Sequence, residues 1–335
     1  MKSPSSVLLI CVRYLGDTLL LRPPIVAVKA AFPDARVGAV VTAGTACALA
    51  DLSALDEVIE WTPRGGLRAW NRLLCGNWDW AVDFTGNDRS ALVALASRAR
   101  FRVAYDRPKL PRWSLKRCAY SFRVRHRKYK PHTLLQRLEL LEACGVPAAG
   151  LDFALAPRPD ALLAVARRLE GIPRPMVLVH PTSRDMKKAL PVAAVRAVIS
   201  ELLAQGRGVV VTSGPSPVER AHATACSRDF SCGLVVLSDL DWHELVAAIW
   251  TCGVFWGSDT APAHIASALA KPSRVEFGPS RADHWHPLHA EGTWAVHECA
   301  CLKRPSCPNG GPGLCLQNID CGEVAKWILS TMGAV

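Results

Sequence analysis

The chain has 335 residues, a length typical of two compact domains, and half of its residues are hydrophobic, which suffices for two cores. The longest apolar runs fall short of the roughly 18 residues needed to cross a bilayer, and the first one, 7–12, ends at Arg13. These features argue against a signal peptide and a transmembrane helix, so we expect a cytoplasmic protein. The net charge of +11 argues for an anionic partner.

The positive charge is concentrated in one segment. Residues 98–130 hold thirteen Lys and Arg and a single acidic residue, Asp106, so this segment carries +12 and the rest of the chain −1. A solvated charged face usually carries both signs, whereas a field of one sign indicates an anionic partner. Nucleic acid, an acidic membrane surface and a phosphorylated substrate all satisfy this requirement.

Thirteen cysteines are present, and most stand singly in apolar segments, as reduced and buried thiols do. Five lie within 23 residues near the C-terminus, namely Cys299, Cys301, Cys307, Cys315 and Cys321. They lack paired C-x-x-C spacing, so we expect no metal, with a metal held by this cluster as the alternative.

The second half alternates apolar runs with helical patterns at the spacing of repeated strand and helix units. Strands are expected at 176–179, 208–212, 234–237, 253–256 and 274–277. Helices are expected at 191–204, 217–227, 242–250 and 261–270, where apolar residues recur every three or four positions. This alternation predicts an α/β fold with a doubly wound parallel sheet.

The first half begins in the same way, with a strand at 7–11, a turn at 13–17, and a helix that Pro23 and Pro24 should kink. Further strands are expected at 37–41, 58–61, 80–84 and 101–104, and a helix at 132–143. Proline and glycine cluster before the second half. We therefore expect two Rossmann-like domains that face a cleft, 1–157 and 176–335, with a connection at 158–175.

Ligands of open parallel sheets bind beyond the carboxyl ends of the strands, beside helix N-termini. Four loops rich in small polar residues occupy such places in the second half, at 180–184, 213–216, 257–264 and 278–280. Lys187 and Lys188 add positive charge, so the loops together predict a cradle for a diphosphate. The structural alternative is that Asp259 only caps a helix and that His264 only packs.

The first domain offers one carboxylate, Asp17, just after its first strand. A carboxylate there would accept a proton from a substrate hydroxyl, unless it serves only as a helix cap. Walker, G-x-G-x-x-G, H-E-x-x-H and G-x-S-x-G motifs are missing from the sequence, which argues against the NTPases, dinucleotide oxidoreductases, zinc proteases and serine hydrolases that carry them.

Several motifs in this order resemble glycosyltransferase family 9, the bacterial lipopolysaccharide heptosyltransferases. They are Arg-x-x-Gly-Asp at 13–17, Thr-Ser-x-x-x-x-Lys-x-x-Pro at 182–191, Ser-Gly-Pro at 213–215 with Glu219, Asp-x-x-Pro-x-His at 259–264 and Phe-Gly-Pro-Ser at 277–280. The cysteine-containing tail after 283–286 looks most like the heptosyltransferase III branch. Leu190 departs from the tryptophan that relatives carry before the proline.

The resemblance implies a GT-B fold, inversion at the anomeric carbon, and ADP-heptose as the donor without a metal or other cofactor. It assigns the general base to Asp17. It assigns contacts with the phosphates, nucleotide or sugar of the donor to Thr182, Ser183, Lys188, Gly214, Glu219, Asp259, Thr260, Ala261 and His264. Spacing to Pro191 favours Lys188 over Lys187 as the phosphate lysine.

The resemblance also implies the acceptor, which is the phosphorylated inner core of lipopolysaccharide at the inner face of the bacterial inner membrane. In this interpretation the N-terminal domain binds the acceptor, and the basic segment contacts its phosphates and the anionic membrane surface. The expected acceptor-binding residues are Arg13, Arg123, Arg125, Arg127 and Lys128. The alternatives are a transferase for another nucleotide sugar, an inactive ADP-binding relative, and a nucleic-acid-binding protein.

Overall fold

The computed structural model describes residues 3–62, 66–106, 114–125, 132–147, 150–298 and 314–333. The chain divides into two compact units, Met1–Ala154 and Leu155–Val335, and each is built on one six-stranded parallel sheet.

The first unit contains, in chain order, β1 (Ser6–Cys11), α1 (Leu15–Leu19), α2 (Arg22–Ala31), β2 (Arg36–Thr42), a 3-10 turn (Ala46–Leu49), β3 (Glu57–Trp61), α3 (Leu67–Leu74), β4 (Trp80–Asp83), α4 (Asp88–Ala96), β5 (Phe101–Tyr105), α5 (Leu115–Cys118), β6 (Phe122–Val124) and α6 (Thr133–Glu142). The second unit contains α7 (Pro159–Arg168), β7 (Met176–His180), a 3-10 turn (Met186–Lys188), α8 (Val192–Ala204), β8 (Gly208–Thr212), α9 (Pro217–Ser227), β9 (Leu234–Leu237), α10 (Trp242–Thr251), β10 (Val254–Ser258), α11 (Ala261–Ala268), β11 (Ser273–Phe277), α12 (Ala282–Trp285), β12 (Gly292–Val296), a 3-10 turn (Leu314–Asn318) and α13 (Cys321–Gly333).

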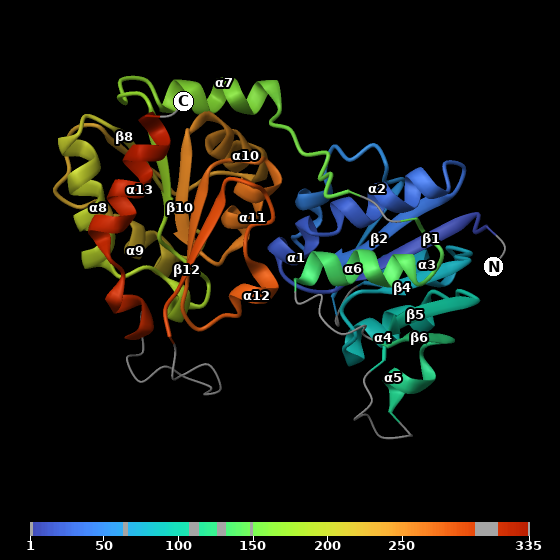
Figure 1. Ribbon diagram of the computed structural model, residues 1–335. Helices are drawn as coiled ribbons and strands as arrows, with labels where there is room; N and C mark the ends of the chain where they lie inside the picture. The colour runs from blue at the N-terminus through green and yellow to red at the C-terminus, as the bar shows by residue number, and fades with distance from the viewer. Residues whose placement is uncertain are drawn as a thin grey trace. The chain divides into compact units, whose positions relative to one another are not determined.

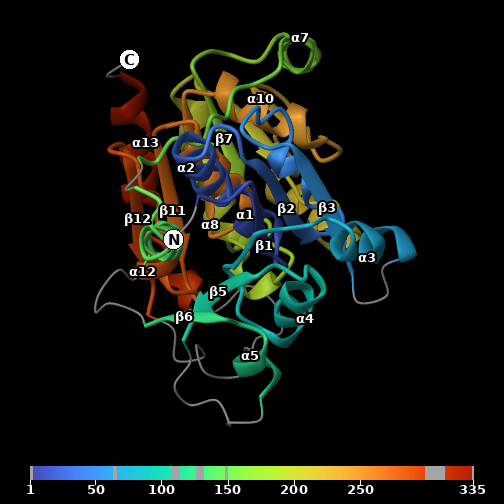
Figure 2. The same cartoon turned by 90° about the vertical axis from the view of Figure 1, so that its right-hand side faces the viewer.

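The sheet of the first unit has the strand order β3-β2-β1-β4-β5-β6. Strand β1 is buried at every position, as expected of a central parallel strand covered on both faces. Its alternate side chains, Leu8 and Ile10, enter a core with Trp61 and Trp78 beneath α3 and α4. Helix α2 covers the opposite side of the sheet (Figure 2). The sheet is therefore wound with helices on both faces.

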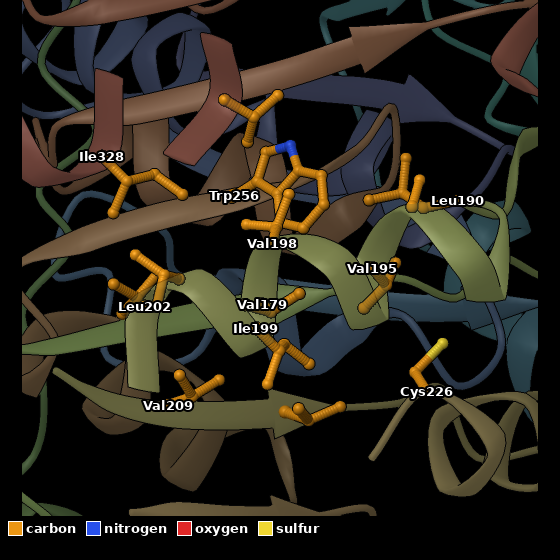
Figure 3. Packing of buried hydrophobic residues seen from close by; sticks show 14 of the residues in the cluster. Val179, Leu190, Val195, Val198, Ile199, Leu202, Val209, Cys226, Trp256 and Ile328 are labelled. Carbon is orange, nitrogen blue, oxygen red and sulfur yellow. The ribbon is translucent and has the colours of Figure 1, made fainter. Parts of the chain in front are cut away.

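The sheet of the second unit repeats this arrangement with the order β12-β11-β10-β7-β8-β9. Helices α8, α9 and α13 lie on one side of it, and α10 and α11 lie on the other (Figure 1). The core under α8 is built from its Val195, Val198, Ile199 and Leu202 with Val209, Trp256 and Ile328 (Figure 3). The predicted α/β class with two doubly wound parallel sheets is thus confirmed.

The beginning of the chain differs from the predicted single kinked helix. Two helices form there instead, because α1 ends at Leu19 and Pro23 and Pro24 lie in the first turn of α2. Proline is tolerated in a first helical turn, where its missing N–H has no intrahelical partner to lose. As a result, the helix that carries Asp17 has only five residues.

The junction of the two units lies between Ala154 and Leu155. The segment expected to be a connection, 158–175, contains α7, which packs against α10 of the second unit. Its proline lies in the first turn of this helix and starts it, so the composition that indicated a linker marks a helix N-terminus.

Candidate functional site

Both sheets share a topological switch point, the feature at which ligands of open parallel sheets bind. In each, the chain order reverses beside the first strand, between β1 and β4 in one unit and between β7 and β10 in the other. Open parallel sheets bind ligands at the carboxyl ends of the strands that flank such a switch point. In the second unit the loops at this point are 181–188, after β7, and 259–260, after β10. These are two of the loops predicted to cradle a diphosphate.

An ion pair joins these two loops. The Nζ of Lys188 lies 2.7 Å from Oδ2 of Asp259, whose side chain is almost fully buried. On its other oxygen, Asp259 faces the Nε2 of His264 at 3.9 Å, and the imidazole of His264 packs edge-on against Trp285. The structure therefore brings the predicted residues Lys188, Asp259 and His264 together at the carboxyl edge of the sheet.

The neighbouring lysine points to a different partner. Lys187 Nζ lies 3.8 Å from the half-exposed Asp185, and that aspartate also accepts a hydrogen bond from the main chain N–H of Lys187. Lys188, but not Lys187, therefore makes the ion pair that joins the loops after β7 and β10.

Helix α11 begins at this same place. Its N-cap is Thr260, whose hydroxyl donates to the carbonyl of Ser258 at 3.3 Å, and Pro262 lies in the first turn. Asp259 is therefore not the cap of this helix, which the sequence left open. The partial positive charge of a helix N-terminus lies next to Thr260 and Ala261, where it favours an anion.

Thr182 is fully buried, and its hydroxyl is engaged within the protein. It accepts a hydrogen bond from the N–H of Gly214 at 3.0 Å and lies 3.3 Å from Nε2 of His180. The other ring nitrogen of His180 lies 2.9 Å from the hydroxyl of Thr212. Burial lowers the pKa of His180 to about 4, so the ring is neutral at pH 7. Thr182 thus joins the loops after β7 and β8.

Glu219 likewise has a partner within its own helix. Ser216 and Glu219 form a reciprocal capping box at the start of α9, in which the carboxylate accepts from the Ser216 hydroxyl at 2.7 Å. A side chain at position 214 would place its Cβ only 2.0 Å from the Glu219 carboxylate, so a larger residue there would displace the end of the Glu219 side chain. Ser183 is also buried in the loop after β7.

In the first unit, Asp17 lies in the first turn of α1, and the N-cap is Tyr14. The expectation of a turn at 13–17, with Asp17 as a possible cap, is therefore wrong. Two arginines contact the buried Asp17 carboxylate at Oδ1: Nε of Arg13 at 3.2 Å and Nη2 of Arg137 at 3.4 Å. Nη1 of Arg137 also donates to the main-chain oxygen of Asp17 at 2.6 Å.

Sequence reasoning missed Arg137, and it included His180 only as the first residue of the loop 180–184. Arg137 lies on the buried stripe of α6 beside Leu134, Leu138 and Leu141, where an amphipathic helix places apolar residues. His180 ends an otherwise apolar strand, β7. A polar residue at a position that the pattern reserves for the core is the signal that identifies both.

The predicted acceptor-binding residues are only partly described. Arg123 lies in β6, Arg125 follows it, and both are exposed. Arg127 and Lys128 lie outside the described residues. Strands β1 and β6 are parallel with two strands between them, so Asp17 and Arg125 follow the carboxyl ends of strands about 14 Å apart.

Of the five late cysteines, the described ones are Cys315, which is buried, and Cys321. Cys299, Cys301 and Cys307 lie outside the described residues. Within the described part of the chain, no group of three or more His, Cys, Asp or Glu side chains is placed to hold a metal ion. Nor does that part contain a helix of the length and apolarity that a membrane crossing requires.

Comparison with known proteins places the chain in a family. The model of glycosyltransferase family 9 (heptosyltransferase) matches residues 67–309. Lipopolysaccharide heptosyltransferase 3 of Escherichia coli (strain K12) is 26% identical over 292 residues, which cover 82% of this chain and 83% of that protein.

Two solved structures share the fold over nearly their whole length. A glycosyl transferase family 9 protein from Veillonella parvula DSM 2008 has a TM-score of 0.80 and 16% identity, covering 99% of this chain and 98% of that one. E. coli heptosyltransferase WaaC with ADP has a TM-score of 0.74 and 18% identity, with coverages of 98% and 100%. With a family model matched over most of the sequence, the chain belongs to glycosyltransferase family 9, the heptosyltransferases.

Proposed function

We propose that this glycosyltransferase moves heptose from ADP-heptose to the phosphorylated inner core of lipopolysaccharide, with inversion at the anomeric carbon. The observation that carries the donor half of the proposal is the Lys188–Asp259 pair at the switch point of the second sheet. The curated relative named lipopolysaccharide heptosyltransferase 3 and the related structure solved with ADP support the same donor and acceptor.

On the donor side, the leaving group is ADP, and negative charge grows on its phosphate as the sugar departs. Lys188 and the N-terminus of α11 supply positive charge where that phosphate would lie. Ser183 and Thr260 offer hydroxyls in the same loops. Thr182, Gly214 and Glu219 shape these loops through their internal hydrogen bonds and close packing. They act on the donor through that shape.

On the acceptor side, Asp17 accepts the proton of the attacking hydroxyl as the oxygen bonds to the anomeric carbon. The bond from that carbon to the ADP oxygen breaks in the same step, so no covalent intermediate with the enzyme is required. The proposal rests on the place of Asp17, a buried carboxylate just after β1 at the switch point of its sheet.

The basic segment binds the acceptor phosphates in this proposal. Arg13, Arg123 and Arg125 lie after or within strands whose carboxyl ends share one edge with Asp17, and they are at least partly exposed. Strands β1 and β6 are about 14 Å apart, so one acceptor molecule can place its hydroxyl at Asp17 and a phosphate at Arg125. We further propose that the excess of arginine holds the protein at the cytoplasmic face of the inner membrane.

The donor assignment is tested by incubating the purified protein with a heptose-deficient lipopolysaccharide core and either ADP-heptose, ADP-glucose or UDP-glucose. We expect ADP-heptose alone to extend the core by one sugar, with one ADP released for each sugar added. A reaction without acceptor controls for donor hydrolysis. Extension with another donor, and not with ADP-heptose, would show that the donor assignment is wrong.

A further inference from the structure

We propose that Arg137 is a positioning residue of the transfer reaction, which fixes the Asp17 carboxylate and directs one of its oxygens to the acceptor hydroxyl. The inference rests on the proposed role of Asp17 as the base. It concerns a residue 120 positions away in the sequence, which α6 brings to the end of β1.

Arg137 contacts Asp17 from the buried side of the carboxylate. Its side chain is only 3% exposed. One terminal nitrogen donates to the Asp17 main-chain oxygen at 2.6 Å, and the other reaches Oδ1 at 3.4 Å and Sγ of Cys11 at 3.4 Å. The guanidinium therefore contacts both the backbone and the side chain of Asp17, which restricts the rotamer of that side chain.

The charge of Arg137 requires a partner in this setting. A guanidinium stays protonated in proteins, and a buried charge without an opposite one costs several kcal/mol. Among the described residues, Asp17 is the acid that makes an ion pair with Arg137. Burial raises the pKa of Cys11 to about 11, so this thiol is neutral and supplies no negative charge. Asp17 is therefore the counter-ion of Arg137.

Two other ionisable groups lie near this pair, Arg13 and Asp83. Arg13 contacts the same Oδ1 from the solvent side and is 42% exposed. Asp83, at the end of β4, accepts hydrogen bonds from the Tyr120 hydroxyl and the main-chain N–H groups of Thr85 and Gly86. Burial raises the pKa of Asp83 above its ordinary value.

The geometry divides the two oxygens of Asp17 between two tasks. Every ion pair and hydrogen bond that the described residues make with its side chain falls on Oδ1. Oδ2 is thereby left to accept the proton of the acceptor hydroxyl. A shift of this carboxylate by about 1 Å is enough to lower the rate of a positioned reaction by roughly 10²-fold. Arg137 therefore affects turnover without touching the substrate.

The test uses Arg137→Lys and Arg137→Gln, each alone and combined with Asp17→Asn. We expect both single variants to lower kcat by about 10- to 100-fold, with the KM for ADP-heptose unchanged. Arg137→Gln removes the positive charge and Arg137→Lys keeps it, so Arg137→Lys should keep more of the kcat. In the Asp17→Asn background, neither change should lower the residual rate further.

Arg22 provides a matched control, since it is a second buried arginine in the same unit. Its guanidinium donates to main-chain oxygens, including those of Ala50 and Phe153, and within the described part of the chain it makes no ion pair. Arg22→Lys should lower the melting temperature without the loss of kcat expected for the Arg137 variants. Melting curves of all variants identify any loss of rate that comes from unfolding, and Arg137→Lys decides the question if Arg137→Gln does not fold.

Two outcomes would overturn the inference. One is that Asp17→Asn loses turnover while both Arg137 variants keep the kcat of the natural protein. The other is that an Arg137 variant lowers the rate equally with and without Asp17, which would make the role of Arg137 structural. A different result, full turnover by Asp17→Asn, would instead remove Asp17 as the base and leave the proposed function without its acceptor half.

Discussion

Replacing Lys188 by alanine tests the donor site most sharply, since the chain carries its own control next to it. Lys188 Nζ lies 2.7 Å from the buried Asp259 carboxylate, whereas Lys187 Nζ lies 3.8 Å from the half-exposed Asp185. A hydrogen bond to a charged group contributes about 1.5–3 kcal/mol, and an exposed ion pair about 0–1 kcal/mol. Lys188→Ala should therefore weaken ADP binding by roughly 10- to 150-fold, and Lys187→Ala by less than about fivefold.

The Lys188 substitution has a second effect that acts in the same direction. It leaves the Asp259 carboxylate without its cation beside the diphosphate, so repulsion adds to the lost contact. Isothermal titration of ADP into both variants measures the two affinities, and Lys188→Arg checks whether charge alone restores binding. If Lys187→Ala weakens ADP binding more than Lys188→Ala, the assignment of the phosphate lysine is wrong.

Three further predictions concern the base, the basic segment and the buried histidine. Asp17→Asn should lower turnover by roughly 10²–10⁴-fold in rate assays, and near-normal turnover would exclude Asp17 as the base. Because this change leaves Arg137 without a counter-ion, it should also lower the free energy of unfolding, measured by calorimetry, by about 3–5 kcal/mol. Changing Arg123 and Arg125 together to Gln should raise the KM for the acceptor and leave ADP affinity unchanged. Added salt should have the same effect on the natural protein, because it screens exposed charges. Unchanged acceptor kinetics with a loss of salt-dependent RNA or DNA binding would favour a nucleic-acid partner. The pKa of His180 is about 4 in the folded protein against 6.5 for the free side chain, so between pH 6.5 and 4 only the unfolded chain gains this proton. The free energy of unfolding should therefore fall by about 3 kcal/mol in total as the pH is lowered over that range. Denaturant titrations should find this pH dependence diminished in His180→Gln, and an equal slope in both proteins would show that His180 does not titrate in this way.

The fold was largely predictable because most strands of the two sheets are buried on both faces. Such strands appear as continuous apolar runs, as in β1, β7 and β8, and the helices between them keep one apolar stripe. Two edge strands were not predicted. β6 has three residues, lies within the basic segment and is mostly exposed, and β12 is partly exposed along its length, so neither shows a buried apolar run.

The candidate site was predictable as a set of loops but not as a set of contacts. Motif spacing located Lys188 and Asp259, and the structure adds the ion pair between them. Thr182 and Glu219 were expected to touch the donor, but their side chains are bound within the loops. A sequence shows that a hydroxyl or a carboxylate is present at a loop, whereas its partners depend on which strands are neighbours. Arg137 is the clearest case, since only the packing of α6 brings it to Asp17.

Mass spectrometry of the lipopolysaccharide core from a strain that lacks this gene tests heptose transfer most directly. We predict that the core loses one heptose together with any sugar attached to it. The natural gene should restore the full core, and a gene with Asp17→Asn should not, even when its expression is raised until its protein reaches the level of the natural one. An unchanged core, or the loss of a sugar other than heptose, would contradict the proposed function.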